Sequence, residues 1–215
     1  MVQSERLTQQ DQLYRLALAL AIFTVAYNLA EGIIATIVGF EDETIALFGF
    51  GLDSFIEMIS GIGIAHMIFR LNRNPMHKRD TFERNALRIT GYSFYLLTAG
   101  LVLGAILVTY IGKKPQTTFW GIVISIVSIL IMLALLYGKL HVGKKLNSDA
   151  IIADANCTRI CIYMSLILLT SSAVYHFTDF SYIDAIGTLG LAWFAFKEGK
   201  ECFEKANSDK YCTCD

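Results

Sequence analysis

The sequence predicts an all-α integral membrane protein with six transmembrane helices. Of its 215 residues, 54% are apolar, only 17% are charged and two are prolines, a composition that soluble domains do not have. The apolar residues form blocks of roughly 20 residues or more, the length of helix that crosses the hydrocarbon core of a bilayer. A membrane β-barrel would alternate apolar and polar residues over segments of about 10, whereas Ile122–Tyr137 is almost unbroken. A soluble enzyme and a β-barrel are therefore excluded.

Each predicted helix is an apolar block that ends where a short polar segment begins. The first follows the polar residues 1–12 and ends at three consecutive acids, and the third ends at a turn containing Gly, Lys and Pro. A short tail, residues 204–215, follows the six-helix domain of residues 13–203. In chain order, the helices are expected at Leu13–Phe40, Thr44–Phe69, Ala86–Ile111, Thr118–Tyr137, Asp149–Tyr175 and Tyr182–Phe203. The segments between them leave no room for a further folded domain.

The positive charges fix the predicted orientation. Of 18 Lys and Arg residues, 15 fall on the side of the two termini and of the second and fourth connections, Lys113 and Lys114 fall on the opposite side, and Arg159 lies within a span. Because Lys and Arg are retained in the cytoplasm, both termini are expected there, which requires an even number of spans. We expect a multi-pass protein, in the cytoplasmic membrane if the source is bacterial. Cysteines in the tail would then be thiols in a reducing compartment.

Two carboxylates inside the second predicted helix are the strongest functional signal. A charged group at the centre of a membrane helix costs roughly 2.5–3.5 kcal/mol, so such residues usually mark a path for ions or protons. Asp53 and Glu57 are spaced i, i+4 and therefore share one helix face. Two ionised carboxylates so close repel each other unless they share a proton or bind a cation. The alternative is that the pair only bonds to neighbouring helices.

The fifth predicted helix carries Asp154, Cys157 and Cys161 on one face. The two cysteines are either ligands or small apolar fillers. Counting about 1.5 Å of rise per residue places both pairs near mid-membrane, with Asp53 level with Cys161 and Glu57 level with Cys157. Two carboxylates and two thiols at one depth would form a four-ligand set suited to zinc or a softer ion.

Other polar residues give weaker predictions. Asn28 and Glu31 on the first helix line the same cavity or bond to a neighbouring helix. Asp149 and Asp184 lie near helix starts, where capping or interfacial roles are typical. Arg159 is expected to pair with an intramembrane acid or to reach an aqueous cavity. The tail could capture a soft cation at the cytoplasmic mouth or be an unstructured end, and its candidate ligands are Cys202, Cys212 and Cys214.

The motifs resemble those of the cation diffusion facilitator family. The segment from Ala46 through Asp53 and Glu57 to Ser60 is similar to the signature of that family's second helix, which binds the transported metal. Ser148–Cys161 is similar to its fifth-helix signature, and Tyr182–Gly199 to the start of its sixth helix. The resemblance covers roughly residues 28–199. It implies six spans, cytoplasmic termini and export of divalent metal in exchange for protons.

Three departures from the family pattern change the expected chemistry. Cys157 and Cys161 stand where the family usually has His and Asp, which should favour softer ions such as cadmium beside zinc. Glu57 replaces the usual Asp. The cytoplasmic metal-binding domain of many members is missing from these 215 residues, so a homodimer, if one forms, must make its contacts through the membrane helices.

Two functions are consistent with the sequence. The first is a secondary transporter, not an enzyme, that exports zinc or a similar cation by proton antiport, with the metal as cargo and no prosthetic group or nucleic acid involved. The second is a membrane scaffold of the same fold that senses metal or redox state without transporting anything. For the first, an acid outer face would displace metal from carboxylates and thiols, and a neutral inner face would load it. The first is favoured because charged groups at mid-membrane are costly to retain without an ion to bind.

Overall fold

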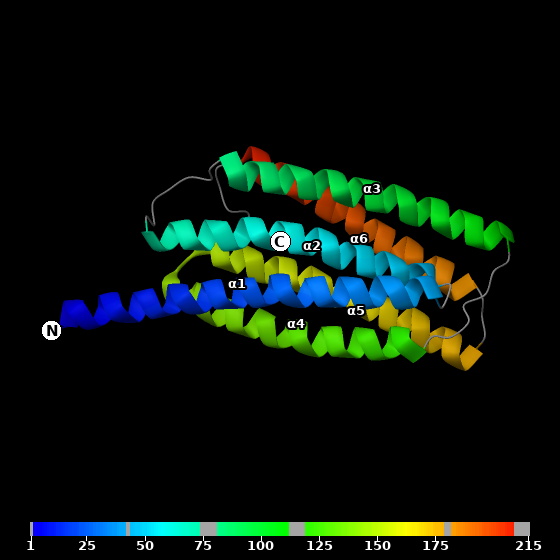
Figure 1. The fold of residues 1–215 in the computed structure, drawn as a ribbon, viewed down its shortest axis with the longest axis horizontal. Helices are drawn as coiled ribbons and strands as arrows, with labels where there is room; N and C mark the ends of the chain where they lie inside the picture. Colours follow the sequence, from blue (N-terminus) through cyan, green and yellow to red (C-terminus); the bar gives the residue numbers. More distant parts are fainter. Residues whose placement is uncertain (1, 42–43, 74–80, 112–118, 179–181, 209–215) are drawn as a thin grey trace.

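The computed structural model is a bundle of six long helices. It describes residues 2–41, 44–73, 81–111, 119–178 and 182–208. The helices are α1 (Val2–Glu41), α2 (Ile45–Arg73), α3 (Thr81–Ile111), α4 (Phe119–Leu146), α5 (Asp149–Thr178) and α6 (Tyr182–Asn207). Successive helices run in opposite directions, so the start of α1 and the end of α6 lie at the same end of the bundle, here called the terminal end (Figure 1). The prediction of an all-α membrane protein with six helices is confirmed.

Packing within the bundle is strongest between three pairs of helices. These are α1 with α2, α4 with α5, and α3 with α6, the last pair being far apart in sequence. α2 also contacts α3, α5 and α6, and it is therefore central to the bundle (Figure 1). Large apolar side chains on α3, α4 and α6 point outward: Leu96, Leu130 and Trp193 are 77%, 63% and 68% exposed. Such an outer surface suits lipid rather than water.

Five of the six helices are long and apolar enough to cross a membrane, judged over the described residues. The helix that falls short is α6, whose second half carries Lys197, Glu198, Lys200 and Glu201. It nevertheless packs along α3 and α5 within the bundle. Its charges are accommodated because Glu198 is buried against other helices while Lys197 and Lys200 face outward.

The predicted boundaries differ most from the structure at two helix ends. α1 begins at Val2 rather than at Leu13. α4 continues nine residues past Tyr137 to Leu146, so most of the expected polar connection is helix. It ends at Asn147, whose φ of 50° is the left-handed conformation, and Ser148 N–H donates to the Gly143 carbonyl at 3.0 Å. This is a Schellman ending, in which Asn takes the place usually held by Gly.

The close approach of α1 and α2 depends on glycine. A Cβ added at Gly39 would overlap the backbone of Phe48, and one at Gly51 would overlap the backbone of α1 at Thr36. Only residues without a side chain allow the two backbones to lie this close, which is typical of packing between membrane helices. The contact fixes where Asp53 and Glu57 of α2 lie relative to Asn28 of α1.

Asp184 is an interhelical cap. Its carboxylate accepts hydrogen bonds from the N–H groups of Ile45 and Ala46, at 3.2 and 3.3 Å. These are the first residues of α2, whose N–H groups have no partner within their own helix. The predicted capping role is therefore confirmed for Asp184, but the capped helix is α2 rather than α6. The side chain of Asp149, for which a similar role was predicted, lies outside the described residues.

Candidate metal site

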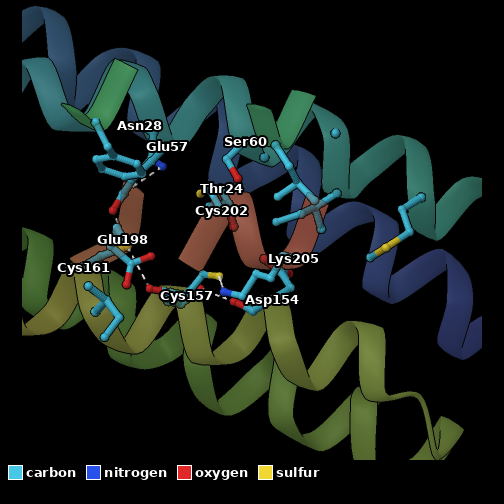
Figure 2. A pocket seen from close by; sticks show the side chains of 18 of the residues that line it. Thr24, Asn28, Glu57, Ser60, Asp154, Cys157, Cys161, Glu198, Cys202 and Lys205 are labelled. Atoms are coloured by element: carbon cyan, nitrogen blue, oxygen red, sulfur yellow. Dashed lines mark hydrogen bonds between the residues drawn. The ribbon is translucent and has the colours of Figure 1, made fainter. Parts of the chain in front are cut away.

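A carboxylate of α2 and a thiol of α5 are in direct contact at the core of the bundle. Cys161 Sγ donates to Glu57 Oε1 at 2.6 Å, and Asn28 Nδ2 of α1 donates to Glu57 Oε2 at 3.2 Å. Figure 2 shows Asn28 and Glu57 on one side of a cavity and Cys161 facing them. The contact brings together a predicted ligand from each of the two helices that the sequence singled out.

Asp53, one turn from Glu57 on α2, is buried with an unpaired oxygen. Its side chain is only 2% exposed, and its Oδ1 atom has no hydrogen-bond partner in the described structure. A buried polar atom without a partner costs roughly 1–3 kcal/mol. An acid retained under these conditions is available to bind a cation, which is what the sequence predicts for it.

A cavity of about 90 Å³ extends from Glu57 and Cys161 toward the terminal end. One water molecule needs about 10–15 Å³, so the cavity has room for several. Every helix contributes to its wall, and α2 does so with Glu57, Ser60 and Met67. Because these residues succeed one another toward the end of α2, the cavity runs from the contact between Glu57 and Cys161 toward the terminal end.

The predicted register between α2 and α5 was wrong by about one turn. Cys161 was expected to be level with Asp53, but Glu57 is its hydrogen-bond partner. The prediction counted residues from helix ends as if both helices stood upright in the membrane. One helical turn is only 5.4 Å long, so a modest tilt or offset between the helices is enough to change the partner.

The four predicted ligands do not form one coordination sphere as they stand. Among the described residues, no three His, Cys, Asp or Glu side chains are placed to hold a metal ion together. Cys157 Sγ instead accepts a hydrogen bond from Lys205 Nζ of α6 at 3.7 Å. The structure therefore joins Glu57 and Cys161, while Asp53 and Cys157 lie one helical turn away from them along α2 and α5. The four-ligand set stays a prediction.

The accessory residues have different environments. Asn28 lines the cavity and touches Glu57, whereas Glu31 accepts hydrogen bonds from Tyr27 at 2.8 Å and Ser54 at 3.1 Å. Glu31 thus makes the packing bonds that were the alternative in its prediction. Arg159 is exposed on the outer surface of α5 and does not line the cavity.

Asp154 belongs to a buried ion pair that the sequence did not reveal. Lys139 Nζ of α4 lies 3.0 Å from Asp154 Oδ1 and donates to Thr158 Oγ1 at 2.9 Å. The side chains of Lys139 and Asp154 are only 2% and 6% exposed. Lys139 had been assigned to a polar connection, because its helix was expected to end at Tyr137. The signal that could have located it is a Lys two residues beyond an unbroken apolar block, facing an acid in the next helix.

α6 supplies cavity residues that sequence analysis missed or misplaced. Glu198 and Lys205 line the cavity, as does Cys202, which is 5% exposed and buried in α6. Cys202 was grouped with the tail as a candidate ligand, but it is buried within α6, which continues to Asn207. Its role in metal capture stays a prediction. Cys212 and Cys214 lie outside the described residues. Glu198, Cys202 and Lys205 are spaced i, i+4 and i+7 and therefore share one helix face. Sequence analysis missed this shared face because the surrounding segment is rich in charged residues.

A comparison with protein families identifies the class of this bundle. The family model of the cation efflux transmembrane domain matches residues 20–208, which includes all the site residues described above. The chain belongs to the cation efflux family. Members are metal cation transporters of the cation diffusion facilitator kind, and the resemblance found in the sequence motifs is confirmed. No curated protein matches the sequence significantly. As a cation efflux protein, the chain is an integral multi-pass membrane protein.

Proposed function

We propose that the protein exports zinc, or a similar soft divalent cation, from the cytosol in exchange for protons. Family membership supports cation transport, and the contact between Glu57 of α2 and Cys161 of α5 supports the location of the transport site. This contact carries the proposal, because it joins a hard and a soft ligand at the inner end of a cavity. The proposed ligands are Asp53, Glu57, Cys157 and Cys161.

The donor set favours zinc, cadmium and related ions. Thiolates prefer soft or borderline metals, and two sulfur and two oxygen atoms suit the tetrahedral geometry of a d10 ion. Assembling the set requires Cys157 to leave the Lys205 ammonium and Asp53 to turn toward Glu57. The unpaired Asp53 Oδ1 breaks no hydrogen bond when it does so.

Proton exchange follows from the ligand chemistry. Cys161 donates a hydrogen bond to Glu57, so the metal must replace at least one proton shared by this pair. Metal binding to carboxylates and thiols releases protons, and acid on the far side returns them and displaces the metal. The charge asymmetry of the chain assigns the terminal end, toward which the cavity extends, to the cytosol. The structure would then represent an inward-facing state.

Flux in proteoliposomes tests the proposal directly. Zinc and cadmium movement across an imposed pH gradient is compared among the unmodified protein, Asp53→Ala/Glu57→Ala and Cys157→Ser/Cys161→Ser. We expect both variants to fall to the level of protein-free vesicles, and a protonophore to reduce flux through the unmodified protein. The matched control is Glu204→Gln on the exposed face of α6, where Glu204 is 59% exposed and should not affect flux.

Metal binding without flux would instead support a sensing or scaffold role. The same vesicles distinguish the two functions, because they can be washed and analysed for retained metal. Normal flux in the Asp53→Ala/Glu57→Ala variant would exclude the proposed site. A homodimer through the membrane helices stays a prediction, and crosslinking in native membranes tests it.

A further inference from the structure

We propose that Glu198 and Cys202 of α6, together with Cys157 of α5, form a second metal site that loads soft divalent cations from the terminal end. It differs from the proposed transport site in its helices, because it needs α6 and neither Asp53 nor Glu57. All three side chains line the same cavity as Glu57 and Cys161 (Figure 2).

The two α6 residues are arranged as ligands on one face. Glu198 and Cys202 are spaced i, i+4, so their side chains are neighbours along the helix. They are only 7% and 5% exposed, although both line a cavity large enough to hold water. Burial of this kind is rare for a Glu unless it is paired or binds a cation.

Glu198 has a buried carboxylate oxygen that is available to a bound cation. Its Oε1 atom is buried and has no hydrogen-bond partner in the described structure. The cost of such an atom is roughly 1–3 kcal/mol, which a bound cation would remove. Asp154, the acid that α5 contributes to the cavity wall, is already paired with Lys139. Among the described residues, Glu198 has no such ion pair.

The ammonium group of Lys205 already lies against Cys157, the third proposed ligand. Lys205 Nζ is 3.7 Å from Cys157 Sγ and 3.3 Å from Glu201 Oε2, and Lys205 is one turn beyond Cys202 on the same helix. A divalent ion that displaces the ammonium from the thiol leaves it a partner in Glu201. The ammonium thus marks a position beside Cys157 where positive charge is accepted.

Two thiolates and a carboxylate define the class of ligand. Each thiol releases its proton when it binds the metal, and the resulting sulfur-rich set favours zinc and cadmium over magnesium or calcium. The three side chains need new rotamers to meet at one ion, because they do not form a coordination sphere as they stand. Cys157 is shared with the proposed transport site, so it would pass the cargo onward, a step that rests on the proposed function.

Cadmium binding to the purified full chain tests this site apart from transport. All proteins carry Cys212→Ser/Cys214→Ser, so that the tail thiols do not contribute, and Asp53→Asn/Glu57→Gln removes the transport carboxylates. We expect this protein to retain cadmium and to show thiolate-to-cadmium charge-transfer absorption. Loss of a residue that only hydrogen-bonds to a metal ligand lowers metal affinity by roughly 10–100-fold. Adding Glu198→Gln/Cys202→Ser removes two ligands themselves and should therefore lower cadmium affinity by at least as much.

The matched control is Cys161→Ser in the same background, which removes a thiol of the same cavity that belongs only to the transport site. We expect it to leave cadmium affinity unchanged. The proposal is wrong if Cys161→Ser abolishes binding while Glu198→Gln/Cys202→Ser does not, or if no cadmium binds once the transport carboxylates are removed. Absence of flux through the unmodified protein, with these binding results intact, would reject the transport function alone.

A second measurement needs no substitution in the cavity and so does not depend on how the variants fold. The protein with all three cavity thiols present is alkylated with a maleimide, and the modified peptides are followed by mass spectrometry. Cadmium should slow modification of Cys202 together with Cys157. Protection of Cys157 and Cys161 without Cys202 would overturn the proposal.

Discussion

Two buried polar clusters meet the same cavity, and they differ in how completely their atoms are paired. In the first, Lys139 bonds to both Asp154 and Thr158, so charge is neutralised within the protein. In the second, Asp53 Oδ1 and Asn28 Oδ1 have no hydrogen-bond partner among the described residues, although both residues are at most 2% exposed. Their difference in pairing indicates different roles. The paired cluster stabilises the contact between α4 and α5, whereas the unpaired one contains Asp53, a ligand of the proposed transport site.

Removing one member of the paired cluster should have the largest effect on stability. Asp154→Ala leaves the Lys139 ammonium buried without its counter-charge, which typically costs 3–5 kcal/mol. The free energy of unfolding of the protein in detergent micelles, measured by denaturant titration, should fall by about that amount. The double variant Lys139→Met/Asp154→Leu should recover most of the loss, because it removes both charges. Equal stability of Asp154→Ala and the unmodified protein would show that the pair is not structural.

The interhelical cap at Asp184 should have the next largest effect. Asp184→Ala deprives the first N–H groups of α2 of their acceptor, and loss of a cap typically costs about 0.5–2 kcal/mol. Asp184→Asn keeps one acceptor oxygen and should lose less. Thermal unfolding of the three proteins under the same detergent conditions tests the order. If Asn destabilises as much as Ala, the negative charge at the α2 N-terminus matters more than the hydrogen bonds.

A single hydrogen bond between uncharged side chains should matter less. Ser128 of α4 and Ser165 of α5 share a buried hydrogen bond of 3.0 Å. Such bonds between membrane helices average about 0.6 kcal/mol, so Ser165→Ala should lower the free energy of unfolding by about that amount. Ser125→Ala is the control, since its hydroxyl donates to carbonyls of its own helix at Gly121 and Ile122. A larger effect at Ser125 than at Ser165 would contradict the assignment.

The sequence predicted the fold well because membrane helices are defined by long apolar blocks. The same property explains its errors at helix ends. The polar residues of Lys139–Leu146 indicate a connection, yet this segment continues α4. Lys139 forms an ion pair with Asp154, and the helix ends at Asn147 in the left-handed conformation. A polar residue that is paired in three dimensions looks the same in sequence as one that faces water.

The candidate site was predictable on α2 and α5 but not on α6. Asp53 and Glu57 are acids within an apolar block, and the free-energy cost of an acid in the bilayer identifies them as candidate site residues. Glu198 and Cys202 lie among the charged residues Lys197, Lys200 and Glu201, where one more acid does not indicate a site. Their importance depends on which face of α6 is buried, and this is determined by packing against α3 and α5. The register of Glu57 with Cys161 likewise depends on helix tilt, which the sequence does not encode locally.

The smallest effect on stability should accompany the largest effect on function. Asp53→Asn keeps the shape of the side chain, and its Oδ1 atom has no hydrogen bond to lose, so the free energy of unfolding should stay the same or rise by at most about 1 kcal/mol. Zinc flux should nevertheless disappear, because the amide does not supply the negative charge that binds the cation. Unfolding in micelles and flux in vesicles are measured on the same preparation. A variant as unstable as Asp154→Ala would show that Asp53 has an undetected structural partner, and a stable variant with normal flux would place the transport site elsewhere.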